Sequence, residues 1–517
     1  MTHPIAATPY GRLAGRFLDH GIARFLGIPY AAAPVGALRL RSPRAATPWS
    51  GQREAARPAP ASLQTLGGNQ TWLNEPIAAQ SEDCLYLNIW TPSLSGSAPV
   101  LVWLHGGQTR NGHGASPAID GAALAATGTV VVTLNYRLGA LGGLAHPALE
   151  DDASGQCANW GLQDKLAALD WVAECIAGFG GDPARVTLGG QSSGAANAVL
   201  IAQHGLARGR YRGLIAQSPP LFRPPMFAAL DDAAAYTEAL AERLGVDVAG
   251  LRQIDGLALQ QAEHAFATSP ELLARMGRPR TAPVLDGRLL RAWPYDGAVA
   301  PLPLLAGWTR TEADFWFDLR DGAGASIAPL KAPQTPDALR TRLTGLIAQH
   351  YAFAEAPTPE AVAAAYADAG SVEQVWRDAY TDLVFRAPIL RLLGQQARAG
   401  QAAWGYEFAF PLAGTAASSP HAADVPFVFG TQAHPHLAPK IGSGPQVDTV
   451  SAAMRAAWAA FVHTGRLPAV PAADTSAVPA WPAFDTAAPR VMRFGPPQPS
   501  LAGLDRPAGL ACWPAYA

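Results

Sequence analysis

The chain has 517 residues, of which 49% are hydrophobic and 15% charged, the composition of an ordinary globular protein with a large buried core. Its 38 basic and 40 acidic residues leave a net charge of −2. This near balance excludes an electrostatic basis for binding nucleic acid or a charged membrane surface.

Neither targeting nor membrane insertion is indicated by the sequence. The start of the chain lacks the basic and then apolar segments of a secretion signal. The most apolar stretch, residues 127–145, contains Asn135 and Arg137, so no run approaches the ~18 apolar residues of a membrane-spanning helix. Four cysteines are few for this length, which favours free thiols. We therefore expect a cytoplasmic protein, and one without a metal site because CxxC and HxxxH spacings do not occur.

Strand and helix patterns alternate in the first half of the chain. Apolar, β-branched runs at residues 99–104 and 129–134 are typical of buried strands. An apolar stripe at helical spacing predicts a helix over residues 162–176. A third strand is predicted at residues 185–188, followed directly by a helix at residues 195–203. This alternation favours an α/β architecture.

Two later segments, residues 227–278 and 336–401, are rich in alanine, leucine and charged residues and lack the strand rhythm of the first half. We expect both to be helical excursions from one sheet-based domain that spans residues 1–517. A separate helical domain is the alternative. After residue 469, prolines are too frequent for long helices.

The pentapeptide GQSSG at residues 190–194 places Ser192 between the third predicted strand and the helix after it. A nucleophilic serine needs such a sharp turn to project its oxygen, and glycines avoid clashes with the neighbouring strand and helix. The helix amino terminus adds a positive dipole. A serine at this place also serves as an ordinary helix cap. The strand before it and the apolar helix after it favour the nucleophile.

The tetrapeptide HGGQ at residues 105–108 follows the first of these strands directly. Backbone N–H groups of such a glycine turn can stabilise the negative charge that acyl transfer builds on the substrate oxygen. Each donor is typically worth about 10²–10³ in rate. A glycine turn without chemistry is the alternative, but the position after a strand and upstream of GQSSG favours an oxyanion role.

Further motifs occur in order along nearly the whole chain. They are FLGIPYA at 25–31, PVG at 34–36, SEDCLYLNIWTP at 81–92, NYRLG at 135–139, GLQD at 161–164, FGGDP at 179–183, IAQS at 215–218, PVLDG at 283–287, PFVFG at 426–430 and WAAF at 458–461. Together they resemble the type-B carboxylesterase family, which includes bacterial p-nitrobenzyl esterases and the cholinesterases. The resemblance implies an α/β-hydrolase fold, with a central, mostly parallel sheet flanked by helices and helical insertions over the active site.

The resemblance also implies the other members of a catalytic triad. The segment at 304–312 points to Glu312 as the acid, and the segment before PFVFG points to His421. The order of nucleophile, acid and histidine is that of α/β-hydrolases. From the residues alone, any of 12 histidines stays open. His105 is the next candidate, although a histidine beside an oxyanion turn usually braces that loop. We expect surface or packing roles for His434, His436 and His463.

Around the nucleophile the chain departs from the family pattern. Gln191 replaces the usual glutamate, which removes a negative charge that could stabilise an imidazolium or a cationic substrate. Ser193 replaces alanine and Gln108 replaces glycine or alanine, yet both keep the backbone N–H that the oxyanion hole needs beside Gly107. A long side chain at Gln108 could narrow the acyl site. Ala313 stands for the usual glycine, a mild change.

Two positions, the missing partner of Cys84 and Trp72, can be compared with secreted relatives and cholinesterases. The cysteine that usually pairs with Cys84 is missing around residues 62–64, which agrees with a cytoplasmic enzyme. Trp72 lies in the region where cholinesterases carry a cation-binding tryptophan, but its spacing to Cys84 differs. An ordinary loop or pocket aromatic is the alternative to a cation site. We name Gln191 and Trp72 as substrate-pocket candidates.

The resemblance therefore implies a serine carboxylesterase that works by two-step acyl transfer on small-molecule esters with short or medium acyl chains. It needs no metal or organic cofactor, and we expect a monomer. The excursions at 227–278 and 336–401 are expected to line the pocket. Alternatives are a hydrolase of a specific amide, carbamate, thioester or natural-product ester, and a non-catalytic cholinesterase-like binding protein. The physiological ester stays open.

Overall fold

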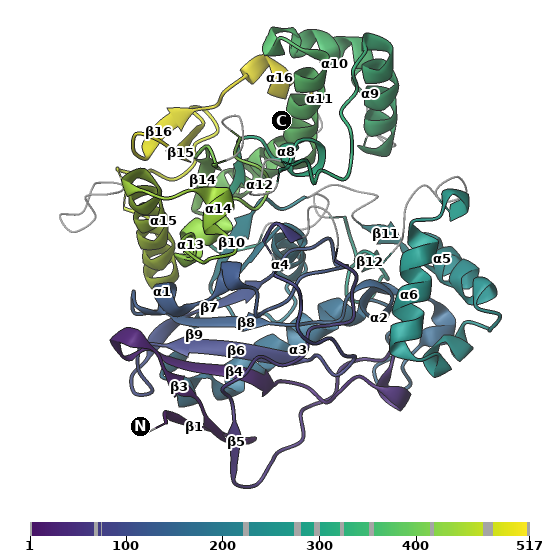
Figure 1. Cartoon of the computed structure of the whole chain (residues 1–517), viewed down its shortest axis with the longest axis vertical. Coiled ribbons are helices and arrows are strands. Elements are labelled where there is room, and N and C mark those ends of the chain that lie inside the picture. Colours follow the sequence, from purple (N-terminus) through teal and green to yellow (C-terminus); the bar gives the residue numbers. More distant parts are fainter. Residues whose placement is uncertain are drawn as a thin grey trace.

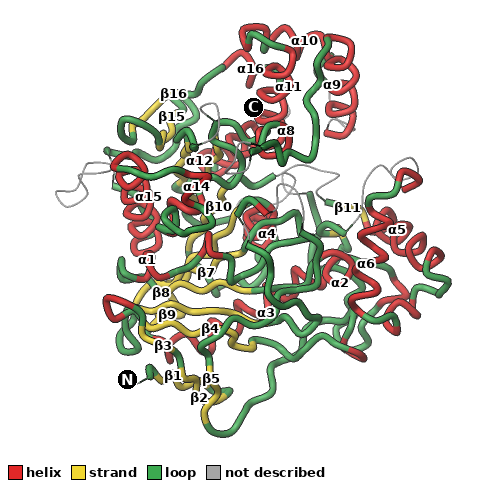
Figure 2. Tube along the Cα trace, in the orientation of Figure 1, coloured by secondary structure: helices red, strands yellow, loops and turns green. Residues whose placement is uncertain are grey.

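Residues 3–66, 71–73, 75–220, 227–272, 281–293, 300–320, 325–350, 356–413, 418–468 and 479–513 are described by the computed structural model. In this part of the chain, an 11-stranded sheet runs through the centre with helices around it (Figures 1 and 2). From edge to edge its strands are β16 (Ser500–Gly503), β15 (Arg490–Phe494), β14 (Ala403–Phe408), β13 (Leu304–Thr309), β10 (Gly213–Gln217), β9 (Gly181–Gln191), β7 (Ala98–Leu104), β8 (Val130–Leu134), β6 (Tyr86–Thr91), β4 (Ala23–Pro29) and β3 (Arg16–Phe17).

The strands from β15 to β8 pair in parallel, and the pairings beyond them at both edges are antiparallel. The central strands are continuous apolar runs because parallel strands are buried on both faces. The other described strands form two small sheets. One consists of β1 (Ile5–Thr8), β2 (Gly11–Ala14) and β5 (Gln52–Glu54), and the other consists of β11 (Ala228–Ala229) and β12 (Val284–Leu285). The predicted mostly parallel α/β architecture is confirmed.

Helices cover both faces of the sheet, as the side chains of β7 show. Val100, Val102 and Leu104 belong to a hydrophobic cluster that includes residues of α3 (Trp160–Cys175), α4 (Ser193–Gln203) and α12 (Ala387–Arg398). Leu101 and Trp103 belong to a second cluster with α13 (Val425–Phe429) and α15 (Pro445–Thr464). Successive side chains of a strand point to opposite faces, so β7 carries one core on each side.

The remaining α-helices lie around these layers. They are α1 (Ala122–Ala125), α2 (Gly139–Gly143), α5 (Leu230–Arg243), α6 (Gly256–Ala267), α8 (Asp314–Phe317), α9 (Pro336–His350), α10 (Pro359–Ala365), α11 (Val372–Thr381), α14 (Ala438–Ile441) and α16 (Pro507–Ala511). A π-helical turn, η9 (Asp382–Arg386), joins α11 to α12. Within the described residues, no helix combines the length and apolarity that crossing a bilayer requires.

The two segments expected as excursions are mainly helical where they are described, and the first also contains the short strand β11. Residues 227–278 contain α5 and α6, and their last six residues lie outside the described part of the chain. Residues 336–401 contain α9 to α12. Figure 1 shows α5 and α6 beside α2 at one side of the molecule, and α9, α10 and α11 grouped with α16 at another. The division into one domain stays a prediction.

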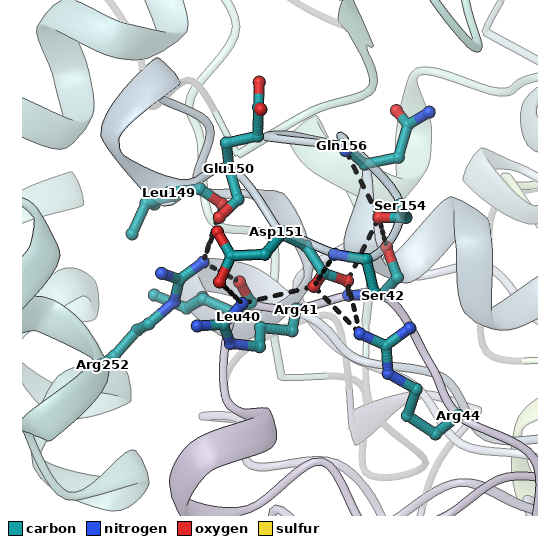
Figure 3. Close-up of polar contacts among 12 residues, drawn as sticks. Leu40, Arg41, Ser42, Arg44, Leu149, Glu150, Asp151, Ser154, Gln156 and Arg252 are labelled. Atoms are coloured by element: carbon teal, nitrogen blue, oxygen red, sulfur yellow. Dashed lines mark hydrogen bonds and ion pairs between the residues drawn. The ribbon is translucent and has the colours of Figure 1, made fainter.

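A buried carboxylate ties the amino-terminal segment to the loop after α2 (Figure 3). Asp151 accepts hydrogen bonds from Arg44 Nη2 at 2.9 and 3.0 Å and from Arg41 Nη1 at 3.2 Å. Beside it, Arg252 from the segment between α5 and α6 donates to the carbonyl of Leu40 at 3.2 Å. These contacts join three segments that are far apart in the sequence.

Candidate active site

Ser192 lies in the turn between β9 and α4, with φ 55° and ψ −128°. Its backbone N–H donates to Gln217 O of the adjacent strand at 2.8 Å, which holds the turn. A Cβ at Gly194 would come within 2.2 Å of Leu104 O, so only glycine lets α4 pack this closely on β7. The strained serine, the strand before it and the helix after it form the predicted strand–turn–helix arrangement.

The fold brings Glu312 and His421 together from different connections. Glu312 follows β13, and His421 lies between β14 and α13. His421 Nδ1 lies 2.5 Å from Glu312 Oε2. The other carboxylate oxygen accepts from Ser218 Oγ at 2.6 Å and from the backbone N–H of Thr309 at 2.8 Å. Glu312 is fully buried, so these donors and not water are the hydrogen-bond partners of its carboxyl group.

The second ring nitrogen of His421 contacts the neighbour of Ser192. His421 Nε2 lies 3.0 Å from the side-chain nitrogen of Gln191. Among the described residues, the hydroxyl of Ser192 forms no hydrogen bond, but Ser192, Gln191 and His421 all line the same cavity. The three predicted triad residues therefore share one site.

Three backbone N–H groups of the HGGQ turn and the turn at Ser192 donate no hydrogen bond to another described residue. They belong to Gly107, Gln108 and Ser193; the last is the first residue of α4, where an N–H has no intrahelical acceptor. A Cβ at Gly107 would lie 2.0 Å from Asn111 O, so the tight turn requires glycine there. Ser193 Oγ accepts from Thr109 N at 3.2 Å and so ties the turn to α4.

His105 lies behind this turn and not in the triad position. Its ring stacks on Tyr136 with centroids 4.2 Å apart, and its Nδ1 lies 2.7 Å from Gly106 O. Burial lowers the pKa of His105 to about 3, so the ring is neutral. This geometry is that of a residue that braces the loop. His434, His436 and His463 are not among the described residues that line the cavities at this site.

The cavity beside Ser192 has a volume of about 750 Å³. Its walls are largely apolar and aromatic, with Leu73, Trp103, Ile119, Phe315, Trp316 and Val425 around the polar triad edge. Trp72, a pocket candidate, is 1% exposed and packs in the second hydrophobic cluster, while its neighbour Leu73 reaches the cavity. Gln191, the other candidate, lines the cavity directly.

A second cavity of about 1320 Å³ adjoins the first and shares Gln108 and Asn111 with it. One wall is a face of α6 in the segment 227–278, from which Gln260, Glu263, His264 and Ala267 line the space. The segment 336–401 reaches the site differently. Phe385 of η9 packs against the His421 ring with centroids 4.9 Å apart.

Several residues around the triad have no role in the sequence-based interpretation. Ser218 lies within the IAQS motif, which was the signal that could have revealed it. Asp424 is fully buried and accepts from Tyr406 Oη at 2.6 Å and Gln217 Nε2 at 2.8 Å. Burial, opposed by the Tyr406 hydrogen bond, raises the pKa of Asp424 to about 6.

Metal ligands do not cluster in the described part of the chain, where no group of three or more His, Cys, Asp or Glu residues could hold an ion. Cys84, Cys157, Cys175 and Cys512 are all free thiols. The polar groups at the site include the hydroxyl of Ser192, the imidazole of His421 and the carboxylate of Glu312 that contacts it.

Comparison with known proteins places this chain in a family. A model of the carboxylesterase family matches residues 2–511. A fumonisin B1 esterase of Sphingopyxis macrogoltabida is 41% identical over 310 residues, 58% of this chain and 55% of that protein, so the match spans about half of that relative. A para-nitrobenzyl esterase of Bacillus subtilis is 32% identical over 483 residues, 90% of this chain and 91% of that enzyme.

A solved carboxylesterase of Geobacillus stearothermophilus has the same fold. It superposes with a TM-score of 0.81 at 30% identity, covering 98% of this chain and 99% of that one. The resemblance inferred from the motifs is confirmed. The chain belongs to the carboxylesterase family and is a carboxylic ester hydrolase with an α/β-hydrolase fold.

Proposed function

We propose that Ser192, His421 and Glu312 form a catalytic triad that hydrolyses small carboxylic esters by two-step acyl transfer. The observation that carries this proposal is the 2.5 Å contact between His421 Nδ1 and Glu312 Oε2 in the wall of the cavity that Ser192 lines. A buried carboxylate on Nδ1 orients the imidazole and stabilises the cation that forms during the reaction.

In the first step, Ser192 Oγ attacks the ester carbonyl carbon while His421 Nε2 takes the hydroxyl proton. The carbonyl π electrons move onto the oxygen, which becomes an oxyanion. Collapse of this intermediate breaks the bond to the alcohol oxygen, and His421 returns the proton to the departing alcohol. An acyl ester on Ser192 remains.

In the second step, water repeats the sequence on the acyl enzyme. His421 takes a proton from the water as its oxygen attacks the acyl carbon. Collapse then releases the carboxylic acid and returns the proton to Ser192 Oγ. The N–H groups of Gly107, Gln108 and Ser193 would bind the oxyanion in both steps, and a donor of this kind is typically worth about 10²–10³ in rate.

The first cavity supports a preference for short or medium acyl groups. Its walls of Trp103, Phe315 and Trp316 suit a compact apolar group. The triad chemistry alone would equally serve an activated amide, carbamate or thioester, so the leaving group is what a substrate screen must decide.

A bulkier natural-product ester is the second candidate, and the second cavity favours it. This cavity is larger, at about 1320 Å³, and begins at Gln108, whose N–H belongs to the proposed oxyanion hole. Polar side chains of Asn197, Gln260 and His264 line it, so it could receive a polar arm of an ester held at Ser192. One relative is named for fumonisin B1, which makes that compound a direct test substrate.

The test compares wild type with Ser192→Ala on p-nitrophenyl esters of increasing acyl length and on fumonisin B1. Loss of turnover in the variant, with short or medium esters preferred by wild type, supports the proposal. Equal rates in the two proteins would show that Ser192 is not the nucleophile. The alternative of a non-catalytic binding protein would then remain. A strict preference for long-chain triglycerides contradicts the proposed acyl range. Faster turnover of fumonisin B1 than of the simple esters favours the second candidate.

We further propose that the enzyme works as a cytoplasmic monomer. The four free thiols support a reducing compartment, because exported proteins of this size commonly oxidise paired cysteines. Light scattering of the purified chain and fractionation of the source cells would test the two statements separately.

A further inference from the structure

The side chain of Gln191 is hydrogen-bonded to Nε2 of His421, the nitrogen that acts as the base in the proposed mechanism. It is the last residue of β9, directly before Ser192, and is 5% exposed. Its side-chain nitrogen lies 3.0 Å from His421 Nε2, while Glu312 holds Nδ1. Both ring nitrogens are therefore hydrogen-bonded, and the partner of Nε2 is the amide of Gln191 instead of the hydroxyl of Ser192.

The chemistry of an amide nitrogen decides what this contact stabilises. A side-chain NH₂ group can only donate, so His421 Nε2 must accept with its lone pair. The ring proton is then on Nδ1, facing Glu312, which is the tautomer that a general base needs. Once Nε2 has taken the proton of Ser192, it also becomes a donor, and two donors repel each other. The contact therefore favours the neutral imidazole, and because Nε2 has a single lone pair, the contact must open before Nε2 takes the proton of Ser192.

The side chain of Gln191 is held in this place by the oxyanion turn. A Cβ at Gly106 would lie 2.4 Å from Gln191 Oε1, so the absence of a side chain at Gly106 leaves the room that the amide fills. The same hypothetical Cβ would lie 3.0 Å from the Cβ of Ser192. The amide thus packs between the turn and the nucleophile, with its nitrogen toward His421.

The other groups around His421 lie on α8, on η9, after β13 and just before α13. Glu312 follows β13 and is the carboxylate in contact with the ring. Asp424 lies three residues after His421 and is already bonded to Tyr406 of β14. The remaining neighbours are rings without charge: Phe315 and Trp316 of α8 at 5.6 and 5.0 Å, and Phe385 of η9 at 4.9 Å. Among the described residues, Gln191 is thus the hydrogen-bond donor that the structure places at Nε2.

We propose that Gln191 is a positioning residue that holds His421 as a neutral, correctly oriented base and so extends ester hydrolysis toward acidic pH. The proposal rests on the proposed function, because it takes His421 as the base of the reaction. A glutamate at this position would act in the opposite direction. Its carboxylate would attract the imidazolium and keep the base protonated to higher pH.

The first experiment measures kcat/KM for p-nitrophenyl butyrate across pH in wild type, Q191E and Q191L. In Q191E we expect the acid limb to move upward by about one to three pH units, the usual effect of an opposite charge at this distance. In Q191L, which keeps the volume but removes the donor, the limb should move upward by less. Gln52 is exposed on β5, so Q52E is a matched charge control that should leave the limb in place.

Superimposable acid limbs in wild type, Q191E and Q191L would overturn the proposal, even if the rates fall, because a packing role alone lowers rates without moving the limb. A second readout does not depend on turnover. In protein labelled with ¹⁵N-histidine, with H421Q used for assignment, the wild-type His421 signal should report a protonated Nδ1 and an unprotonated Nε2. A protonated Nε2 at neutral pH would contradict the contact, because Gln191 would then have to accept.

These outcomes separate the two proposals. Equal hydrolysis by wild type and Ser192→Ala overturns the triad, while the labelled ring still reports whether Gln191 holds Nε2. Loss of activity in Ser192→Ala with unmoved acid limbs supports the triad and overturns the role of Gln191.

Discussion

Ser218 Oγ donates a hydrogen bond of 2.6 Å to Glu312 Oε1, the carboxylate oxygen that does not face His421. The backbone N–H of Thr309 donates to the same oxygen at 2.8 Å. Two donors on one oxygen fix the plane of the carboxylate, and the other oxygen is thereby aimed at His421 Nδ1. Ser218 and Glu312 are both fully buried, so water cannot take the place of the hydroxyl.

We therefore expect Ser218→Ala to lower kcat for a p-nitrophenyl ester about 10-fold to 100-fold with little change in KM. Loss of one hydrogen bond to a charged group typically costs about 1.5–3 kcal/mol, and about 1.4 kcal/mol is a factor of ten in rate. The substrate itself does not contact Ser218, so binding should be preserved. Steady-state kinetics of the variant measure both constants.

The control for this change is Ser500→Ala, which removes an exposed hydroxyl at the edge strand β16 and should leave kcat unaltered. Unchanged kcat in Ser218→Ala would show that Thr309 N alone holds the carboxylate.

Local patterns were sufficient to predict the elements that carry Ser192. The runs at 99–104 and 129–134 correspond to β7 and β8, and the helices at 162–176 and 195–203 to α3 and α4. Most residues of these segments are buried, so their apolar patterns are strong. The strand predicted at 185–188 is longer, Gly181–Gln191, because Gly181 pairs with Ala98 of β7 and residues 189–191 pair with β10.

The partners of Ser192 could not be predicted from local pattern. Glu312 and His421 are 109 residues apart and meet through the fold, so their identification depended on the family resemblance. The contact between Gln191 and His421 spans 230 residues and follows from packing around Gly106. The sequence shows that Gln191 differs from the family pattern, but only the structure shows that its side chain contacts His421 Nε2.

Asp151 offers a test of stability away from the site. It accepts hydrogen bonds from Arg41, Arg44 and the backbone of Ser42, and its side chain is 1% exposed. Burial acts to raise the pKa of Asp151, but hydrogen bonds from Ala153 N, Ser154 and Ser42 N and the charge of Arg44 outweigh it, so the pKa is lowered. We expect Asp151→Asn to lower the free energy of unfolding by about 2–3 kcal/mol at pH 7 in urea denaturation.

The sign of the pH dependence follows from the lowered pKa. The stabilisation from Asp151 is present above the unfolded-state pKa, near the ordinary aspartate value of 3.8, and is lost as pH falls through the lower folded-state pKa. Asp152→Asn is the matched control, because the Asp152 side chain is 93% exposed and pairs with the same Arg41 at 3.6 Å. It should cost at most about 1 kcal/mol. Equal losses in the two variants would mean that burial of Asp151 contributes nothing.

Lys165 predicts a pH dependence of the same sign in a higher pH range. It is buried in α3, donates to Gly161 O at 2.9 Å and lies 3.4 Å above the ring of Tyr136, which stacks on His105. Burial lowers the pKa of Lys165 from 10.5 to about 7. Between these two values the unfolded chain binds more protons than the folded one, so the contribution of this residue to stability rises with pH.

We expect Lys165→Met to raise the free energy of unfolding at pH 7 and to flatten its increase toward pH 9.5, an effect on the order of a few kcal/mol. Urea denaturation at the two pH values measures both quantities. Lys331 is exposed, so Lys331→Met should leave the pH dependence as it is in wild type. An equal rise in Lys165→Met and wild type would show that Lys165 is charged in the folded protein at both pH values.

The charge of the first cavity predicts which esters the enzyme accepts. Its described lining residues include neither Asp nor Glu, and Gln191 supplies a neutral amide beside Ser192. Trp72, the alternative cation partner, is buried away from the cavity surface. We expect wild type to hydrolyse 3,3-dimethylbutyl acetate with higher kcat/KM than acetylcholine, which has nearly the same shape but carries a positive charge that must be desolvated.

In Gln191→Glu, a carboxylate facing the cavity should shift this ratio toward the cation by about tenfold, or about 1.4 kcal/mol. Measuring both esters at one pH cancels the effect of the variant on His421, because the base is common to the two reactions. Ser218→Ala, which alters the triad without adding charge, should slow both esters alike. A ratio that stays unchanged in Gln191→Glu would place the alcohol group outside the reach of residue 191, and the second cavity at Gln108 would then be the site that receives it.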